Sequence, residues 1–410
     1  MHLKSDETMS MPVLISLLLL LTACQGSFRA KEGKPIELIE TWPVETPMDL
    51  PELADAEPTW LDMIDLAKER IDIGQFYVQT RSDTSLDRVL KALESAAKRG
   101  VKIRFLVDEA FVKRYPEDTG QTVARIATWP NTEVKVMKRW AAAGGVQHCK
   151  YFIVDGKEAF LGSQNFDWRA LEHIVELGVR IRSKPLVATF LAVFEDDWTY
   201  AFESNMTSDF DRATFKPIEW QVEGETQRAY LLVSPSPGKS LEELWDLPTI
   251  VRMIDEAEKT VQLTSMNYRP RFFSKEPFTT IQDALIRAAQ RGVKVRVMGD
   301  DRNRDTDWGA LVAGGVEAGE VKIPQHSSGA IPYARLTHAK FMVVDQSKAW
   351  IGTANIEGDY FFHGRNLTLV LEAPALARQL HGFFMHYWNS SYNRVLQLRD
   401  TLPQATSSWP

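Results

Sequence analysis

The sequence has little cysteine, no excess of positive charge and no long hydrophobic run. Its only cysteines are Cys24 and Cys149, so disulfides do not hold the fold together. Lys and Arg total 48 against 55 Asp and Glu, which gives a net charge of -7. No general positive field therefore draws the protein onto nucleic acid or anionic lipid. Any anionic substrate must be held by local positive charge.

The remaining composition is that of a folded protein. Apolar residues make up 44% of the 410 residues and charged residues 25%, with 23 Gly and 20 Pro. These values exclude a disordered, collagen-like or coiled-coil chain. At roughly 150 residues per domain, the length indicates about two domains, each large enough to bury a core.

The first residues are typical of an export signal. An apolar stretch of about a dozen residues precedes Cys24, whereas a membrane-spanning helix needs about 20. The alternative is a buried N-terminal helix. The segment 21–24, Leu-Thr-Ala-Cys, resembles the lipobox of bacterial lipoproteins. That resemblance implies a signal peptide over 1–23 and lipidation of Cys24.

Lipidation would place the mature chain in the cell envelope of a bacterium, anchored to a membrane and facing the periplasm. Gln25 favours the outer membrane over the inner one. The following residues, 24–50, contain Pro35, Pro43 and Pro47 and are expected to form an extended tether.

An internal duplication organises the rest of the chain. The segment 96–104 is echoed by 288–296, which lies 192 residues later, and 161–165 is echoed by 351–355, which lies 190 residues later. The copies are too long for solenoid or propeller repeats. We therefore predict a first domain over 51–205, a linker over 206–227, a second domain over 228–400 and a tail over 401–410.

Each copy has the pattern of a parallel strand–helix–strand crossover. Apolar periodicity predicts a strand over 71–78, a helix over 86–99 and a strand over 101–108. The second copy repeats these elements over 260–266, 281–291 and 293–298. The expected fold class is α/β, with a mixed, mostly parallel sheet flanked by helices in each domain.

Both copies carry the same polar residues at the same spacing. The first has His148, Lys150, Asp155 and Asn165, and the second has His338, Lys340, Asp345 and Asn355. Positions i and i+2 of a strand share a face, so each His-x-Lys places an imidazole beside an ammonium group. Cys149 then points the other way and is expected in the core rather than as a nucleophile.

This set of residues suits attack on a phosphodiester. Lysine and asparagine donors stabilise the negative charge that develops on phosphate oxygens. One histidine serves as the nucleophile, and the other protonates the leaving oxygen and later activates water. Imidazole suits both tasks because its ordinary pKa is near 6.5. This chemistry needs neither a metal nor an organic cofactor.

The duplicated His-x-Lys-x4-Asp, each followed by Gly-Ser/Thr-x-Asn, resembles the signature of the phospholipase D superfamily. The segments 165–169, 176–178, 265–268 and 358–361 are similar to the subgroup of endolysosomal phospholipase D-like 5′-exonucleases and the poxvirus nicking-joining nuclease. The resemblance implies one active site between two domains packed as a pseudo-twofold pair. It also implies that a single chain supplies both half-sites, so that a monomer suffices.

The resemblance further implies roles for individual residues. His148 is expected to attack and His338 to act as general acid and base, although the reverse assignment is open. Asp155 and Asp345 are expected to hold the loop of the motif. Glu176, which lies 28 residues after His148, matches the carboxylate that orients a catalytic imidazole.

The second copy departs from that pattern. Asn366 stands where the first copy has Glu176, and Asp359 is a candidate substitute for the missing carboxylate. Trp198 and Trp388 occupy matching positions and are expected in the core. Five of the six other histidines lie in the repeats, have no shared ligand spacing and are expected to be surface or core residues: His173, His326, His363, His381 and His386.

Three functions remain open on the sequence. The first is hydrolysis of single-stranded nucleic acid from its 5′ end, with bases stacked on Phe76, Tyr77, Tyr268 or Phe361. The second is phospholipase D or phosphatidyl transferase activity on membrane phospholipid, which a lipid anchor favours. The third is a catalytically idle protein that binds phosphate groups.

Overall fold

Two mixed sheets dominate the computed structural model, which describes residues 34–204, 207–302 and 308–401. In spatial order the first contains β2 (Ala54–Asp55), β1 (Ile36–Thr41), β10 (Glu176–Ile181), β8 (Glu158–Gly162), β7 (Lys150–Val154), β3 (Arg70–Gln75), β5 (Lys102–Asp108) and β6 (Thr132–Met137). The second contains β11 (Ile218–Val222), β12 (Glu225–Ser234), β18 (Asn366–Glu372), β17 (Lys348–Gly352), β16 (Phe341–Val344), β13 (Thr260–Thr264), β14 (Lys294–Asp300), β15 (Glu317–Val321) and β19 (Asn393–Val395). A short pair, β4 (Val78–Gln79) and β9 (Phe166–Asp167), lies apart from both.

The predicted crossovers are confirmed. Strands β3 and β5 are parallel neighbours joined through α2 (Ser85–Lys98), and β13 and β14 are joined in the same way through α7 (Thr280–Gln290). Both helices are followed by a glycine with positive φ, Gly100 at +98° and Gly292 at +90°. The expected predominance of parallel pairing is wrong, because hairpin-linked antiparallel strands form most of each sheet.

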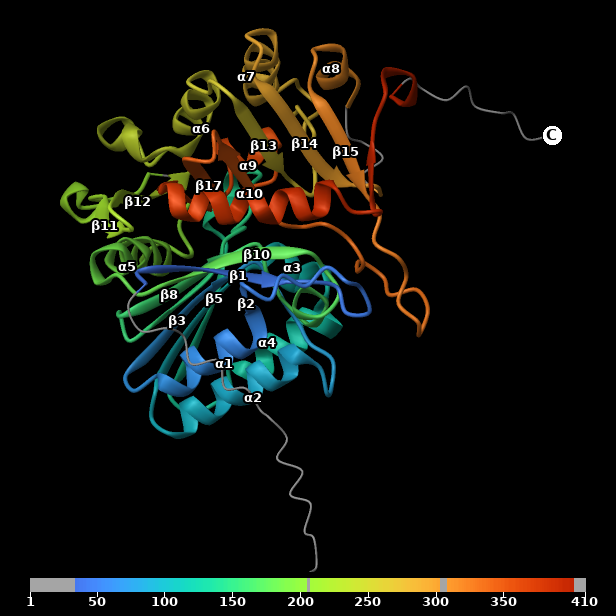
Figure 1. Cartoon of the computed structure of the whole chain (residues 1–410). Coiled ribbons are helices and arrows are strands. Elements are labelled where there is room, and N and C mark those ends of the chain that lie inside the picture. The colour runs from blue at the N-terminus through green and yellow to red at the C-terminus, as the bar shows by residue number, and fades with distance from the viewer. Residues whose placement is uncertain (1–33, 205–206, 303–307, 402–410) are drawn as a thin grey trace, which may run out of the picture. The chain divides into compact units, whose positions relative to one another are not determined.

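Helices cover both faces of each sheet (Figure 1). The outer faces carry α1 (Ala56–Leu66) and α2 on the first sheet, and α6 (Asp246–Asp255) and α7 on the second. Between the sheets lie α5 (Lys184–Thr199) and α10 (Pro374–Trp388), whose apolar faces join both repeats in one core. The shorter helices are α3 (Glu109–Arg114), α4 (Gln121–Ile126), α8 (Trp308–Ala313) and α9 (Gly358–Phe362).

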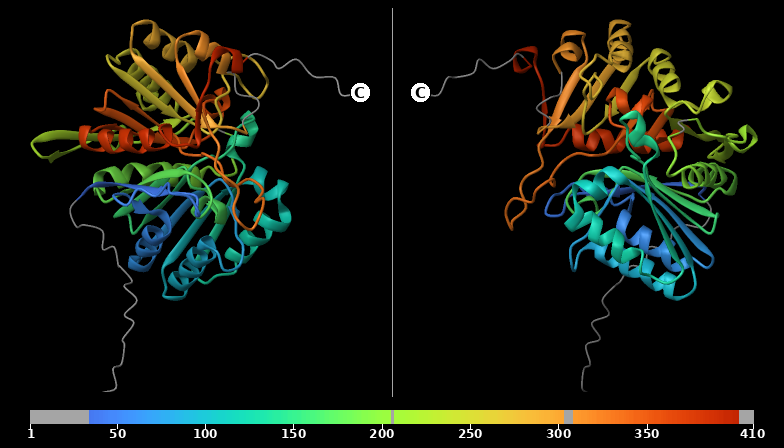
Figure 2. Two further views of the ribbon diagram at one scale, coloured as in Figure 1. Left: turned by 45° about the vertical axis from the view of Figure 1, so that its right-hand side comes forward. Right: turned by 180° about the vertical axis from the view of Figure 1, so that it is seen from behind.

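The two repeats share this central core. Trp198 on α5 and Trp388 on α10 are both buried in it, as their matching positions predict. Figure 2 shows α5 and α10 running between the two sheets from two further directions. A fully buried ion pair adds to the contact, because Arg365 of the second repeat donates to Asp197 of the first (Nε to Oδ2, 3.1 Å).

The predicted tether over 24–50 is wrong from Ile36 onward. Residues 36–41 form β1, which pairs antiparallel with β10 from Ile36↔Ile181 to Thr41↔Glu176. The prolines misled the prediction, because they flank the strand and leave its ladder intact. Part of the predicted linker 206–227 is also folded, since β11 lies within it and pairs with β12.

The N-terminal predictions concern residues outside the described ones. These predictions are the signal peptide over 1–23, the lipidated Cys24 and the first part of the tether. Most of the tail 401–410 is likewise outside the described residues. Within the part of the chain that the structure describes, no helix is long and apolar enough to cross a membrane.

Candidate active site

The histidine of each His-x-Lys motif lies where the backbones of the two repeats meet. His148 N–H donates to Arg365 O (2.9 Å), and Arg365 N–H donates back to Val146 O (3.0 Å). His338 N–H donates in the same way to Val175 O (2.8 Å). Both side chains are buried, with 3% of His148 and 7% of His338 exposed. The structure thus brings the two halves of the motif together in one site between the repeats.

Lys150 and Lys340 place two positive charges in this buried site. Both are fully buried, and each ammonium group donates to the carbonyl of its own histidine, His148 (2.6 Å) or His338 (2.8 Å). Burial lowers the pKa of Lys340 to about 7, and burial together with the charge of Lys340 holds the pKa of Lys150 well below its usual range. An anion bound here would relieve this repulsion and favour both charged forms.

His338 pairs with a carboxylate from the other repeat. Its Nδ1 lies 2.8 Å from Glu176 Oε2 and 2.9 Å from Oε1. Burial raises the pKa of Glu176 to about 8, while burial and the two lysines lower the pKa of His338. A proton shared between Nδ1 and the carboxylate is consistent with both shifts, and it lets a second hydrogen lie on Nε2. His338 is loaded as a proton donor.

His148 pairs with an amide instead. Its Nδ1 lies 3.1 Å from Asn366 Oδ1. The amide is oriented, because Asn366 Nδ2 donates to Tyr360 O (2.7 Å) and Oδ1 accepts from the Thr353 hydroxyl (3.0 Å). An oxygen facing Nδ1 requires the hydrogen there, which leaves the lone pair on Nε2. Burial and the nearby Lys150 hold the pKa of His148 well below its usual range, so the ring stays neutral.

These contacts identify the side chain that orients each imidazole, which the sequence left open for one of the two histidines. Glu176 orients an imidazole, as predicted, but that imidazole belongs to the other repeat. The proposed role of Asp359 is wrong, because its carboxylate accepts from His363 Nδ1 (2.9 Å) and from the backbone of Phe273. Asn366 itself contacts His148, and no motif within one repeat could reveal a pairing between repeats.

Asp155 and Asp345 hold loops, as the resemblance implies. The Asp155 carboxylate accepts from the backbone N–H groups of Lys68, Glu69 and Arg70 at 2.8–3.0 Å. Asp345 accepts three backbone N–H groups in the equivalent loop of the second repeat, at 2.7–2.9 Å. Each carboxylate ties the turn after the His-x-Lys strand to the start of the neighbouring strand.

The sequence interpretation missed two further aspartates. Asp108 Oδ2 accepts from the N–H of Gln147 (2.7 Å), and Asp300 Oδ2 accepts from the N–H of Thr337 (2.9 Å). The two donor residues, Gln147 and Thr337, each directly precede a histidine of the motif. The two aspartates are 192 residues apart, which is the offset of the first echoed segments, so the duplication itself carried the signal.

Asn165 and Asn355 complete the predicted set. They are 6% and 2% exposed, and within the described residues their Oδ1 atoms have no hydrogen-bond partner. Buried amide groups are normally satisfied, so these side chains retain hydrogen-bonding capacity for a ligand. Cys149 is fully buried in the central core, and burial raises the pKa of its thiol, which agrees with a packing role.

Aromatic rings surround His148 and continue away from it. The centroid of its ring lies 4.9 Å from that of Phe76 and 4.5 Å from that of Tyr360. Phe76 in turn contacts Phe111 (4.2 Å), which stacks on Tyr77 with an interplanar angle of 14°. These rings are partly exposed. They form a continuous aromatic surface that begins at the site.

Two of the aromatics expected to stack on substrate are core residues. Tyr268 and Phe361 are fully buried among the apolar side chains of the second repeat. Phe76 and Tyr77 keep partial exposure, so only these two of the four candidates remain available. The sequence missed Phe111, because its position beside the site depends on where α3 packs.

Among the described residues, no histidine outside the motif takes part in a cluster of metal ligands. Within the described ranges, the only group of three side chains placed to hold a metal ion is Glu40, Asp49 and Asp55. His173 and His326 contact each other edge to face, with ring centroids 5.0 Å apart.

Comparison with known proteins gives consistent matches over the repeats. A family model described as "Cardiolipin synthase, PLD-like domain" matches residues 60–198 and again residues 250–388. "Phospholipase D Z" of Dictyostelium discoideum is 27% identical over 395 residues, which cover 88% of this chain and 90% of that protein. "5'-3' exonuclease PLD3" of Bos taurus is 28% identical over 403 residues, which cover 88% of this chain and 81% of that protein.

A solved structure supports the fold. The phosphatidylserine synthase of Haemophilus influenzae Rd KW20 matches with a TM-score of 0.58 at 12% identity, over 83% of this chain and 85% of that one. At this identity the likeness speaks for the arrangement of the two repeats and not for a substrate.

Proposed function

This chain belongs to the family of PLD-like domains and is a phosphodiesterase of the phospholipase D superfamily, and we propose that it hydrolyses single-stranded nucleic acid from the 5′ end. The reaction passes through a covalent phosphohistidine. The observation that carries the proposal is the aromatic surface that begins at His148, because proteins that bind single-stranded nucleic acid stack its bases on aromatic side chains.

The first step forms the covalent intermediate. The lone pair on His148 Nε2 attacks phosphorus, and a P–N bond forms as the P–O bond to the leaving oxygen breaks. That oxygen takes the hydrogen from His338 Nε2, while Glu176 returns a proton to Nδ1. Lys150 and Lys340 stabilise the charge on the phosphate oxygens.

The second step reverses these roles. Water attacks the phosphorus and gives its proton to His338 Nε2, and the P–N bond breaks to restore the lone pair of His148. One histidine must be neutral and the other proton-loaded at the start, which is the state that Asn366 and Glu176 respectively favour. Both half-sites belong to one chain, so a monomer is sufficient for the cycle.

Substrate choice is tested by a side-by-side comparison of two substrates. The purified chain is given a 5′-hydroxyl single-stranded oligonucleotide and, separately, phosphatidylglycerol or phosphatidylethanolamine vesicles at pH 5 to 8. We expect shortening of the oligonucleotide and no release of lipid headgroup. Cleavage or headgroup exchange of lipid alone would replace the proposal with phospholipase D or phosphatidyl transferase activity. Binding without turnover of either substrate would indicate the idle phosphate-binding protein.

A variant on the aromatic surface sharpens this test. Phe111→Ala removes a ring that lies beyond the catalytic residues, so KM for the oligonucleotide should rise about tenfold or more. Turnover of bis(p-nitrophenyl) phosphate, which has no base to stack, should stay unchanged. Phe202→Ala removes an exposed aromatic that is 59% accessible and remote in sequence, and it serves as the matched control.

We also propose that the chain acts at the bacterial envelope, held at the outer membrane through a lipid on Cys24. The lipobox-like segment 21–24 supports this proposal. Metabolic labelling with a palmitate analogue, compared between the natural chain and Cys24→Ala, tests it. Equal labelling of both would contradict it.

A further inference from the structure

Two acidic residues face each other at the edge of the first sheet. In the parallel pairing of β1 with β2, Glu40 is the register partner of Asp55. Asp49 lies on the loop between these strands, and the three side chains each bring a carboxylate oxygen within 4.8 Å of the others. Like charges directly across a strand pair are destabilising. Something must offset this repulsion.

The second repeat shows that the fold does not require these charges. Glu40 pairs with Leu177, and 190 residues later Leu367 pairs with Val233, so Val233 occupies the place of Glu40. Val233 is in turn bridged in parallel to Trp245, as Glu40 is to Asp55. The same two positions hold an apolar pair in one repeat and an acidic pair in the other. Packing alone therefore does not explain the carboxylates.

Within the described part of the chain, two buried polar atoms at this place have no hydrogen-bond partner. Glu40 is fully buried, and its Oε1 accepts from Leu50 N–H (2.7 Å), whereas its Oε2 has no hydrogen-bond donor. The Tyr387 hydroxyl from α10 is fully buried and also has no partner. Burial and, after it, the charges of Glu40 and Asp49 raise the pKa of Tyr387, so this hydroxyl lies within electrostatic reach of the cluster. Burial and the neighbouring acids raise the pKa of Glu40 to about 8.

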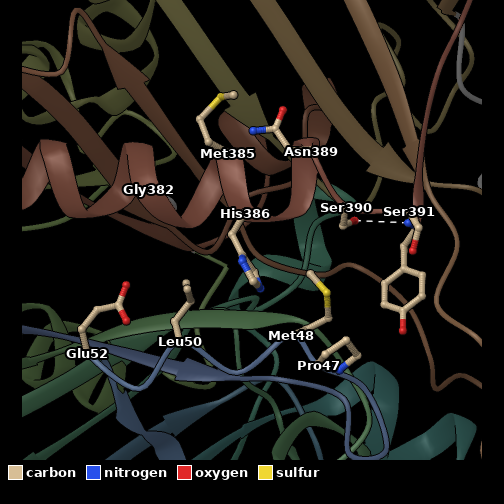
Figure 3. Close-up of a pocket in the computed structure, with 11 residues that line it drawn as sticks. Pro47, Met48, Leu50, Glu52, Gly382, Met385, His386, Asn389, Ser390 and Ser391 are labelled. Atoms are coloured by element: carbon tan, nitrogen blue, oxygen red, sulfur yellow. Dashed lines mark hydrogen bonds between the residues drawn. The ribbon is translucent and has the colours of Figure 1, made fainter.

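Solvent can reach this acidic cluster from one side. A cavity of about 330 Å³ is lined by Glu40, Asp55 and Trp42 among others. A second cavity of about 600 Å³ is lined by Leu50 and Glu52, which follow Asp49 in the chain, and by residues of α10. Figure 3 shows these two side chains rising from the loop, with His386 pointing from the helix towards the same loop. An ion from solution therefore has a route to the cluster.

We propose that Glu40, Asp49 and Asp55 bind a calcium ion that ties the N-terminal loop to the first sheet. Only oxygen ligands are present, which suits a hard cation. Three carboxylates also favour Ca²⁺ over Mg²⁺, because Mg²⁺ keeps several of its waters and is usually bound through only one or two carboxylates. Water completes the coordination, and the free Oε2 of Glu40 and the Tyr387 hydroxyl gain a partner through it.

The ion has a structural role near the site rather than a catalytic one. Thr41, the residue after Glu40, is the register partner of Glu176, which orients His338. Binding therefore stabilises the strand pair that carries Glu176 and leaves the chemistry to the histidines. Chelation should lower the melting temperature without lowering kcat at temperatures where the chain stays folded.

Terbium luminescence and thermal unfolding test the proposal. Trp42 hydrogen-bonds to Asp55, so Tb³⁺ in the site should emit on tryptophan excitation and be displaced by CaCl₂ but not by equal MgCl₂. CaCl₂ should raise the melting temperature by at least about 3 °C over EDTA. Glu40→Val copies the second repeat and should fold but lose both effects. Asp49→Asn, at an exposed position, should weaken both effects.

A matched control and the contrary results complete the design. Asp65→Asn changes an exposed aspartate on α1 outside the cluster and should keep the full response to calcium. Equal melting temperatures of the natural chain in CaCl₂ and EDTA would overturn the proposal. A calcium response that survives in Glu40→Val would also overturn it. A higher melting temperature of Glu40→Val, with no effect of calcium on the natural chain, would overturn it as well. That result would mean that a shared proton holds the acidic pair together.

Discussion

The two repeats are nearly identical where they hold the motif and different where they contact the imidazoles. Asp155 and Asp345 each accept three backbone N–H groups in equivalent loops. By contrast, His148 receives an amide partner and His338 a carboxylate partner. The positions that shape the loops are thus duplicated, and the positions that set the protonation of each histidine have diverged. A duplicated enzyme with one site needs this divergence, because a nucleophile and an acid require different charge states.

The largest expected effect comes from removing either imidazole. His148→Ala and His338→Ala should each lower kcat by about 10³-fold or more, because the first loses the covalent step and the second loses proton transfer. Circular dichroism should show an intact fold for both. His381→Ala changes a half-buried histidine of α10 outside the motif, and as the control it should keep normal turnover. Retention of comparable activity by either active-site variant would refute the two-histidine mechanism.

Exchanging the partners of the histidines breaks the asymmetry itself. Glu176→Gln cannot hold a proton for His338, so kcat should fall about 10²-fold at all pH values. Asn366→Asp places a negative charge beside His148 and raises its pKa. Its activity should therefore be lost most at pH 5 and recover towards pH 8, where the ring is neutral again.

Measuring kcat of Glu176→Gln and Asn366→Asp across pH 5 to 8 shows how their pH profiles differ. Asp359→Asn serves as the control, because this carboxylate contacts neither histidine of the motif. Identical pH profiles for Glu176→Gln and Asn366→Asp would mean that the two partners play the same role.

The lowered pKa of Lys340, about 7, predicts how substrate binding depends on pH. The ammonium form that binds phosphate is present below this pH and is lost above it. The value of kcat/KM should therefore fall by up to tenfold for each pH unit above about 7. In Lys340→Arg the side chain stays charged, so kcat/KM should fall less above pH 7. Its maximum value should be lower, because a guanidinium group differs in shape from an ammonium group. A profile of the natural chain that stays flat to pH 9 would show that the lysine keeps its proton.

The smallest catalytic effect should come from the loop aspartates. Asp155→Asn or Asp345→Asn weakens three backbone hydrogen bonds and should lower the free energy of unfolding by about 1–3 kcal/mol. Both substitutions should cost a similar amount, because the two loops are equivalent, and kcat should change less than about fivefold. Urea unfolding measures the first effect. A loss of turnover as large as that of His148→Ala, with normal stability, would show that an aspartate touches the substrate.

Much of this architecture was predictable because it repeats. The echoed segments predicted the crossovers, and the spacing of His-x-Lys with Asp155 or Asp345 predicted which side chains share the site and which hold a loop. Asp108 and Asp300 were also within reach, since they recur at the offset of the echoed segments. Periodicity and duplication are local signals, and they locate residues well along each repeat.

Contacts between repeats carried no such signal. Glu176 lies in the first repeat and orients the histidine of the second, and only the packed structure reveals that crossing. Strand β1 was hidden for a related reason, because its partner β10 lies far along the chain and its flanking prolines suggested a tether. Tyr268 and Phe361 could not be separated from Phe76 by sequence, since all are aromatic residues near the motifs and only packing buries two of them.

Direct detection of the intermediate tests the central claim that the two histidines have different roles. The His338→Ala variant, mixed with a phosphodiester that carries a good leaving group, forms the adduct without the acid and lacks the base that activates water for its hydrolysis. Quenching under alkaline conditions and peptide mass spectrometry should then place the phosphoryl group on His148. An adduct on His338 in the His148→Ala variant, together with no adduct on His148 in the His338→Ala variant, would contradict the assignment.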